Sequence, residues 1–425
     1  MIRNFFLACT IAVEMLAGSA SISLAQSSSD NADIAPQRWW KGNLHTHSLW
    51  SDGDDFPEMI TQWYSERDYN FLALTDHNTL SQGMKWMRLD AIEARGGKVI
   101  FEKYLKRFGN DWVQTRGEPG SEEYSVRLKP IDEYRGLVEQ TGKFILIQSE
   151  EISDRAQGKP VHINAANLLE AIQPVGGATV LEAMQNNLRA ILEQESKTGR
   201  QILPHLNHPN FGYAITAEEL AQVISERFFE VYNGHPGVNH LGDKDHISVE
   251  RIWDVANTIR LVALNAAPLL GLGTDDSHEY HGLPGSRPGR GWVMVRSCFL
   301  TPEHLILAMK NGDFYASSGV TLDDVRYHQD DRRLSLKIKP EANVKYKTEF
   351  IASLRQRGSS ADALPTSENI GKVVATSDSL EPAYSLTGNE IYVRAVVTSS
   401  LSPTDPVFEN QKQQAWTQPV GWSTK

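Results

Sequence analysis

Cysteine is nearly absent from this chain, and long apolar runs are absent. Cys9 and Cys298 are the two cysteines among 425 residues, which excludes a fold built on several disulfides or on cysteine-rich zinc sites. The apolar stretch at residues 5–16 is shorter than the about 20 residues that a membrane-spanning helix needs. The sequence therefore predicts no membrane span, and a fold held by its core or by metal ions.

An excess of positive charge is also missing. The formal net charge is −11 and the isoelectric point is about 5.7. Nucleic acids and anionic membrane surfaces are bound through basic patches, so the negative net charge argues against both as partners. The sequence also has no Gly-x-Ser-x-Gly motif, which would mark a serine hydrolase. We expect a small-molecule substrate.

The N-terminus has the pattern of a secretory signal peptide. Arg3 precedes the apolar stretch, and Ser23-Leu24-Ala25 offers small residues for cleavage. We predict that residues 1–25 are removed near Ala25, that residues 26–38 are a disordered start of the mature chain, and that the protein is periplasmic or secreted. Cys298 would then be the one cysteine left, so no intramolecular disulfide can form.

Apolar strand-like segments alternate with helical patterns through most of the chain. Phe144-Ile145-Leu146-Ile147 is apolar on both faces, as in a parallel strand that is covered on both sides. This alternation predicts an α/β domain over residues 39–320, with a parallel sheet or barrel and a mostly helical insertion at about 80–143. The predicted strands are 41–47, 70–76, 144–150, 201–207, 228–233, 262–265, 270–275 and 292–297.

The pattern changes after residue 320. Residues 334–339 and 390–397 alternate between apolar and polar side chains, as half-buried antiparallel strands do. We predict a small all-β domain over residues 321–425. Trp416 and Trp422 are expected to pack this domain rather than to bind a ligand.

The stretch from Gly42 to Gly53 holds the first candidate metal ligands. His45 and His47 are two residues apart, so in an extended strand both side chains point to the same face. Two imidazoles placed in this way can bind zinc or another transition metal, and Asp52 follows in a Ser-Asp-Gly turn. Taken alone, two histidines in a polar loop would explain this stretch as well.

Similar polar residues recur downstream, each at the point where an apolar run ends. In a β/α barrel these carboxyl ends of strands meet at one mouth, where active sites lie, so the recurrence favours one metal centre. Strand alternation lets only one of Glu150 and Glu151 point inward, and a regular strand cannot aim both His205 and His208 inward. The recurring residues are Asp76, His77, Glu150, Glu151, His162, His205, His208, Asp276 and His278.

This set of motifs resembles the PHP (polymerase and histidinol phosphatase) family of metal-dependent hydrolases, over residues 39 to about 297. The resemblance rests on His45-x-His47, Thr75-Asp76-His77, Glu151-Ile152-Ser153, His162, Asn207-His208-Pro209-Asn210 and Asp276-x-His278. The sequences Trp40-Lys-Gly-Asn-Leu-His45 and Glu230-Val-Tyr-Asn-Gly234 are most similar to an exported branch that includes carbaryl and carbamate hydrolases. The resemblance implies a distorted (β/α)7 barrel, so we predict such a barrel followed by the small β domain that the pattern after residue 320 indicates.

The resemblance also implies two or three divalent metal ions, which Zn, Mn or Fe would all suit. His45, His47, Glu151 and Asp276 would hold the first metal, and Glu151 would bridge to a second metal that His162 and His208 complete. Asp52, His77 and His278 would hold a third, with Asp52 standing where some members have histidine. Glu151 is preferred over Glu150 because the Ile-Ser that follows it fits the family motif, and His205 is expected to be structural.

We therefore predict an exported hydrolase that uses a metal-bridging hydroxide, with phosphoesters favoured as substrates. Hydrolysis of a carbamate or carboxylic ester at the same metals is the alternative, and a non-catalytic metal-binding exported protein is a third reading. Arg287 and Arg290 are candidates for binding a phosphate, or they make surface contacts. Asp76 would support a ligand or move protons, or it caps a helix.

Six further histidines show no partner pattern and are expected in loops or on the surface, with His281 a minor candidate for the pocket. They are His235, His240, His246, His281, His304 and His328.

Overall fold

The computed structural model describes residues 36–356 and 363–423, which belong to one compact unit. The predicted signal peptide and most of the predicted disordered start lie outside the described residues. The first strand, β1, begins at Arg38. Within the described ranges, no helix has both the length and the apolar character needed to cross a membrane.

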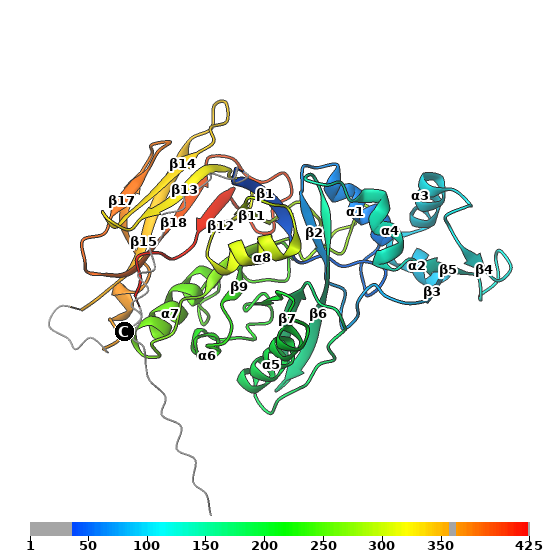
Figure 1. Cartoon of the computed structure of the whole chain (residues 1–425), viewed down its shortest axis with the longest axis horizontal. Coiled ribbons are helices and arrows are strands. Elements are labelled where there is room, and N and C mark those ends of the chain that lie inside the picture. Colours follow the sequence, from blue (N-terminus) through cyan, green and yellow to red (C-terminus); the bar gives the residue numbers. More distant parts are fainter. Residues whose placement is uncertain (1–35, 357–362, 424–425) are drawn as a thin grey trace, which may run out of the picture. The chain divides into compact units, whose positions relative to one another are not determined.

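One mixed sheet organises the unit (Figure 1), in the order β10-β9-β8-β7-β6-β2-β1-β11-β12-β19-β18-β15-β16. The neighbours β1/β2, β2/β6, β8/β9 and β9/β10 are parallel, whereas β6 and β7 form an antiparallel hairpin. The α/β class is thus present. The strands that precede the tail are β1 (Arg38–Asn43), β2 (Phe71–Leu74), β6 (Ile145–Ala156), β7 (Lys159–Ala166), β8 (Leu203–Leu206), β9 (Phe228–Asn233), β10 (Leu270–Thr274), β11 (Trp292–Ser297) and β12 (Phe314–Ser317).

The two strands β1 and β10 are not neighbours in the sheet order, but the chain segments that follow them meet. Thr46 and Ser277 form an isolated parallel bridge, in which His47 N donates to Ser277 O at 2.9 Å. On the other side of the bridge, Asp276 N donates to His45 O at 2.9 Å. This bridge brings the first and the last of the predicted ligand motifs side by side.

Helices connect the strands, and α5 to α8 begin at side-chain caps. Thr179, Thr216, Ser248 and Thr301 each accept a hydrogen bond from a backbone N–H of the first turn, which a helix start otherwise leaves unpaired. The helices are α1 (Pro57–Ser65), α4 (Ile131–Val138), α5 (Val180–Thr198), α6 (Ala217–Gln222), α7 (Val249–Val262) and α8 (Pro302–Lys310).

The predicted strand at 262–265 is wrong. Val262 is the last residue of α7, and the run of apolar residues there belongs to a helix face. Leu261 and Val262 are buried against Ile391 and Tyr392 of the tail. A short apolar run does not distinguish a strand from a buried helix end, which explains the error.

The insertion at 80–143 contains strands as well as helices. Strands β3 (Lys85–Arg88), β4 (Thr115–Arg116) and β5 (Ser125–Leu128) form a separate antiparallel sheet in the order β3-β5-β4. Helices α2 (Leu89–Gly96), α3 (Val99–Phe108) and α4 complete it. The strands are too short to leave a period of two in the sequence.

The tail after residue 320 is built of strands, with one short 3-10 turn at Ser367–Asn369, in the part that the structure describes. Strands β13 (Leu322–His328), β14 (Arg333–Ile338) and β17 (Ala383–Ser385) form a small sheet. Strands β15 (Tyr346–Leu354), β16 (Lys372–Ser377), β18 (Glu390–Ser399) and β19 (Gln414–Thr417) extend the main sheet.

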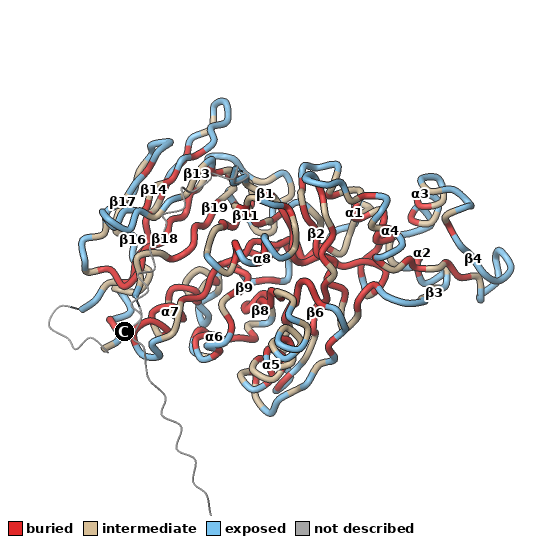
Figure 2. Tube along the Cα trace, viewed as in Figure 1, coloured by how far each residue is buried: buried red, intermediate tan, exposed pale blue. Residues whose placement is uncertain are grey.

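The tail shares its core with the rest of the unit. Trp416 is buried and stacks on Tyr232 of β9, with 5.6 Å between the ring centroids. The Gln418 side chain accepts from Gly271 N at 2.8 Å and donates to Gly271 O at 2.9 Å. The amide thus satisfies both backbone groups of Gly271 in β10. Figure 2 shows the buried residues running through the central strands and into the tail.

Candidate metal centre

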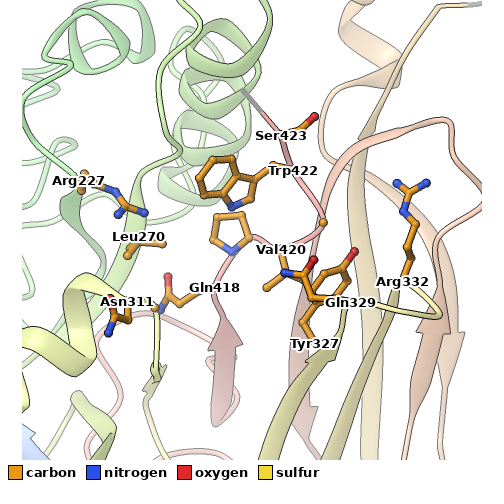
Figure 3. Close-up of a pocket in the computed structure, with 13 residues that line it drawn as sticks. Arg227, Leu270, Asn311, Tyr327, Gln329, Arg332, Gln418, Val420, Trp422 and Ser423 are labelled. Carbon is orange, nitrogen blue, oxygen red and sulfur yellow. The ribbon is translucent and has the colours of Figure 1, made fainter. Parts of the chain in front are cut away.

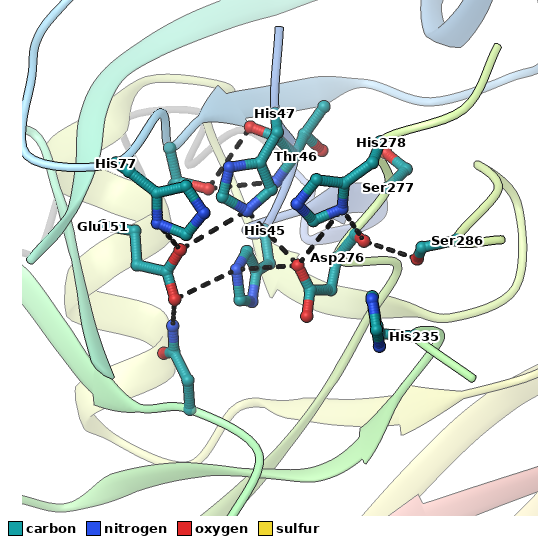
Figure 4. Close-up of polar contacts among 12 residues, drawn as sticks. His45, Thr46, His47, His77, Glu151, His235, Asp276, Ser277, His278 and Ser286 are labelled. Atoms are coloured by element: carbon teal, nitrogen blue, oxygen red, sulfur yellow. Dashed lines mark hydrogen bonds and ion pairs between the residues drawn. The ribbon is translucent and has the colours of Figure 1, made fainter. Parts of the chain in front are cut away.

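His45 and His47 lie just after β1, at the bridge to Ser277. Both side chains are fully buried, and their ring centroids are 5.1 Å apart. The two Nε2 atoms lie 3.1 Å and 3.2 Å from Asp276 Oδ1. Figure 4 shows the rings and this carboxylate gathered with Glu151 and His77. The His-x-His pair therefore faces a shared carboxylate on the chain that follows β10.

Glu151 on β6 is the second shared carboxylate, and its side chain is only 1% exposed. Its oxygens lie 2.8 Å from His77 Nδ1, 2.9 Å from His162 Nδ1 and 3.8 Å from His208 Nε2. They also lie 3.6 Å from His45 Nε2 and 3.4 Å from His47 Nε2. Burial alone would raise the pKa of Glu151, but these histidines hold it well below its usual value.

Asp276 adopts a backbone conformation that costs energy. Its φ is 49°, in the left-handed region that side chains other than glycine adopt at some cost. The hydrogen bond from Asp276 N to His45 O helps to hold this turn, and Asn233 Nδ2 donates to Asp276 Oδ2 at 3.1 Å. The turn places both Asp276 and His278 at the cluster.

A third group of potential ligands opens toward solvent. Asp52 Oδ2 lies 3.3 Å from His77 Nε2, and Asp52 Oδ1 lies 3.5 Å from His278 Nε2 and 3.6 Å from His47 Nδ1. The Asp52 side chain is 55% exposed, unlike the buried His45 and His47. This group forms the outer edge of the cluster.

The residues present fit divalent cations. The buried atoms His45 Nε2, His47 Nε2, Glu151 Oε2 and His162 Nδ1 lie close to other atoms of the cluster, but none has a partner at hydrogen-bond geometry among the described residues. Buried polar atoms normally have one. The groups His45/His47/Glu151, Glu151/His162/His208 and His47/Asp52/His77/His278 each have ligand atoms within 4.8 Å of one another. Imidazole and carboxylate are the ligands that zinc, manganese and iron share.

The structure thus brings the nine predicted metal ligands into one cluster. They are His45, His47, Asp52, His77, Glu151, His162, His208, Asp276 and His278.

Glu150 faces away from this cluster. Its Oε1 accepts from Ile172 N at 2.6 Å, and burial raises its pKa to about 7. In the β6–β7 hairpin Glu150 is paired with Ala165 and Glu151 with Asn164, as the alternation of a strand requires. Of the two glutamates, Glu151 is the one among the histidines.

Glu230 on β9 is a site residue that the sequence reasoning missed. It is buried, and its Oε1 lies 2.7 Å from His45 Nδ1 and 3.4 Å from His205 Nε2. Thr274 Oγ1 donates to Oε1 and His208 N donates to Oε2, each at 2.8 Å. The sequence feature that could have identified Glu230 is its position as a charged residue inside the apolar strand Phe228–Asn233. His205 is fully buried against Glu230, behind His45.

Asp76 and the two arginines that were predicted to bind phosphate all have partners within the protein. Asp76 is buried and accepts from Ser48 N at 2.8 Å, Ser48 Oγ at 2.7 Å and Ser51 Oγ at 2.6 Å, so it holds the loop that carries Asp52. Arg290 donates to Asp405 and to the carbonyls of Gly234 and Gly285.

Arg287 also reaches the tail. Its NH1 lies 3.4 Å from Asp405 Oδ1, and its Nε donates to Leu283 O at 2.9 Å. The two arginines therefore join the loop after His278 to the tail, and within the described residues neither forms a hydrogen bond or ion pair with the nine predicted metal ligands. Both contacts depend on Asp405, which lies more than a hundred residues away in the sequence.

The other histidines fall into two classes. His235 is half-buried beside His278, with 5.7 Å between the ring centroids, and burial lowers its pKa. His240 lies in a loop, as the expectation allowed, but its side chain is buried. His281 Nε2 lies 3.2 Å from Asp55 Oδ2. The side chains of His246, His304 and His328 are exposed, as expected.

A separate cavity of about 690 Å³ lies at the opposite ends of the strands (Figure 3). Its lining includes Arg227, which precedes β9, Leu270 at the start of β10, and Trp422 of the tail. The site histidines follow the other ends of these strands, and none of the nine predicted ligands lines this cavity.

No family model and no curated protein matches the chain. One solved structure that matches is described as a two-domain protein containing a predicted PHP-like metal-dependent phosphoesterase from Bacteroides vulgatus, with 16% identity and a TM-score of 0.41. The match covers 91% of this chain and 97% of that one. A second is a candidate metal-dependent phosphoesterase from Bifidobacterium adolescentis, with 13% identity, a TM-score of 0.29, and coverage of 58% and 90%. The chain is similar to both proteins.

Proposed function

We propose that this chain is a metal-dependent hydrolase of the PHP family and that phosphoesters are its substrates. The observation that carries the proposal is the cluster itself, in which six histidines and Asp52 meet around the carboxylates of Glu151 and Asp276. Structural zinc sites are closed and usually four-coordinate, whereas this cluster offers more ligands and an exposed edge at Asp52. These features favour a catalytic site over a structural one.

The ligands divide into three positions. His45, His47, Glu151 and Asp276 would hold one cation, Glu151 with His162 and His208 a second, and Asp52, His77 and His278 a third. Divalent cations bound there would supply an activated water near neutral pH and would polarise the scissile bond. Zn, Mn and Fe all suit these ligands.

The chain's own residues hold the ligands in place. Glu230 orients His45 through Nδ1, and Asn207 Nδ2 donates to Glu151 Oε1 at 2.8 Å. Asp76 orders the loop with Asp52. Such supporting contacts fix the orientation of ligands and raise metal affinity.

Hydrolysis of a carbamate or carboxylic ester is the second candidate, as in the exported branch that the motifs resemble. The position of Arg287 and Arg290 favours it, because both guanidinium groups already bind Asp405. A phosphate dianion gains most from a free guanidinium, whereas a neutral ester needs none.

The two reactions are distinguished by kinetics of the metal-loaded protein on p-nitrophenyl phosphate and p-nitrophenyl acetate. These substrates share a leaving group, so their kcat/KM ratio reports the acyl or phosphoryl preference directly. The proposal expects metal-dependent hydrolysis of the phosphate. Robust esterase activity without phosphatase activity would replace it by the second candidate, and activity on neither would favour a non-catalytic metal-binding protein.

We also propose a PHP-type barrel and export. The bridge between Thr46 and Ser277 supports closure of the strands around the cluster. Export rests on the sequence of residues 1–25 alone. N-terminal sequencing of the protein from its native source tests export, and an intact Met1 would contradict it.

A further inference from the structure

His235 stands at the metal centre without belonging to any group of potential metal ligands. It follows Gly234, which approaches the chain after β10 so closely that a Cβ would lie 2.6 Å from Asp275 O. Only glycine permits this approach, which carries the next residue to the cluster. Figure 4 shows the ring of His235 next to Asp276 and His278.

Asn233 fixes the backbone of His235 relative to the cluster. Its Oδ1 accepts from His235 N at 2.7 Å. Its Nδ2 donates to Glu230 Oε2 at 2.8 Å and to Asp276 Oδ2 at 3.1 Å. One buried amide therefore ties His235 to a potential ligand and to the carboxylate that supports His45. These hydrogen bonds of Asn233 therefore hold His235 in a fixed position relative to the metal ligands.

The ring of His235 has one defined neutral tautomer. Gly237 N donates to His235 Nδ1 at 2.9 Å, so Nδ1 must carry a lone pair. In the neutral imidazole the proton then lies on Nε2. A proton on Nδ1 would face the Gly237 N–H, so this contact also disfavours the imidazolium.

The Nε2–H of His235 has no acceptor among the residues that the structure describes. Its recorded polar contacts are those of Nδ1 and of the backbone, and the ring is held from its sides by Phe211 and His278, at 5.5 Å and 5.7 Å between centroids. A half-buried donor that is oriented in this way can bind an acceptor that enters the site.

We propose that His235 binds the substrate, and that its neutral Nε2–H donates a hydrogen bond to a phosphoryl oxygen of an ester at the metal centre. The proton stays on His235, so no proton transfer is involved. This inference rests on the proposed function. It also supplies a phosphoryl contact that Arg287 and Arg290, bound to Asp405, do not provide.

The test compares His235→Gln with His235→Ala. The amide nitrogen of Gln reaches the position of Nε2 and is a neutral donor, whereas Ala has none. We expect His235→Ala to lower kcat/KM on p-nitrophenyl phosphate by about 10- to 150-fold, the range of one hydrogen bond to a charged group. His235→Gln should stay within about 5-fold of wild type on the same scale. His246→Ala, at an exposed histidine, is the control.

Two readouts besides activity accompany the kinetics. Elemental analysis should give the same metal content in both His235 variants as in wild type, and loss of metal from His235→Ala would overturn the proposal by making His235 a ligand. Calorimetric titration of the metal-loaded protein with inorganic phosphate should show weaker binding in His235→Ala and near-normal binding in His235→Gln.

The phosphate titration separates this inference from the proposed function. A wild type without phosphatase activity would contradict the function, while weaker phosphate binding by His235→Ala would still support the contact. Unchanged phosphate affinity in His235→Ala would overturn the contact even in an active enzyme. A Gln variant as defective as Ala would overturn the role of a neutral donor.

Discussion

His45 Nδ1 and Glu230 Oε1 lie 2.7 Å apart, and both side chains are fully buried. Burial alone would raise the pKa of Glu230, but His45 and His205 hold it below its ordinary value, so the carboxylate accepts and His45 Nδ1–H donates. In the neutral imidazole, which is the form that binds a metal, the lone pair of His45 then lies on Nε2, which is 3.1 Å from Asp276 Oδ1. A carboxylate behind a histidine in this way sets the tautomer that a metal ligand needs.

Glu230→Gln should therefore weaken metal binding by about 10- to 100-fold while the protein stays folded, because Gln accepts from His45 less strongly than a carboxylate. Competition with a chromogenic chelator measures the metal affinity. Glu226→Gln is the matched control, since Glu226 is equally buried but has no recorded contact with the cluster. Equal metal affinities in both variants would show that Glu230 does not position His45.

Glu151→Gln should remove most of the activity and at least one metal, whereas Glu150→Gln should change little. Glu151 lies among five histidines, and Glu150 accepts from Ile172 N on the other face of β6. Kinetics on p-nitrophenyl phosphate, paired with elemental analysis, compare the two variants. A larger defect in Glu150→Gln would mean that the register of β6 is shifted by one residue.

Stability should fall as the pH rises from about 5 to about 9, partly because of Glu226. Burial raises the pKa of Glu226 to about 8, well above the about 4.3 of an unfolded glutamate. Between these values the folded state holds a proton that the unfolded state has lost, so stability declines with rising pH. Urea unfolding at pH 6 and pH 9 should show a smaller decline for Glu226→Gln. Identical declines would refute the raised pKa.

Arg394→Met should destabilise the protein by about 3–5 kcal/mol, because it leaves the buried Asp254 of α7 without its cation. Arg394 NH2 lies 2.8 Å from Asp254 Oδ2, and both side chains are nearly inaccessible. Lys347→Met, which breaks the pair of the exposed Lys347 with Glu349 in the same tail, should cost far less, because solvent screens this pair. Urea unfolding of the metal-free proteins compares them, and similar losses would show that Arg394 does not join the tail to α7.

Local patterns in the sequence predicted much of the site. His45 and His47 share a face because strands have a period of two, and Asp276 and His278 follow an apolar run in the same way as His77. These residues meet because β2 lies beside β1 and because the bridge between Thr46 and Ser277 joins the segments that follow β1 and β10. The boundaries of β9 and β11 were also predicted, since their apolar runs are bounded by turns.

Contacts between distant segments could not be predicted. The pairing of Arg290 with Asp405 joins residues 115 apart, and no local pattern records it. The role of Glu230 depends on His45, which lies 185 residues away. Strand β7, which carries His162, was missed because its first residues, Lys159 and Pro160, follow Gly158 and together have the pattern of a turn.

Metal dependence is most directly tested by adding metal back to chelator-treated protein while bound metal and hydrolysis of p-nitrophenyl phosphate are measured on the same samples. Chelation should abolish the activity, and Zn, Mn or Fe should restore it in step with binding of two or three ions per chain. His45→Ala, His208→Ala and Asp276→Ala should each bind fewer ions. Phosphatase activity that survives chelation, or unchanged metal content in all three variants, would contradict a metal-dependent phosphoesterase.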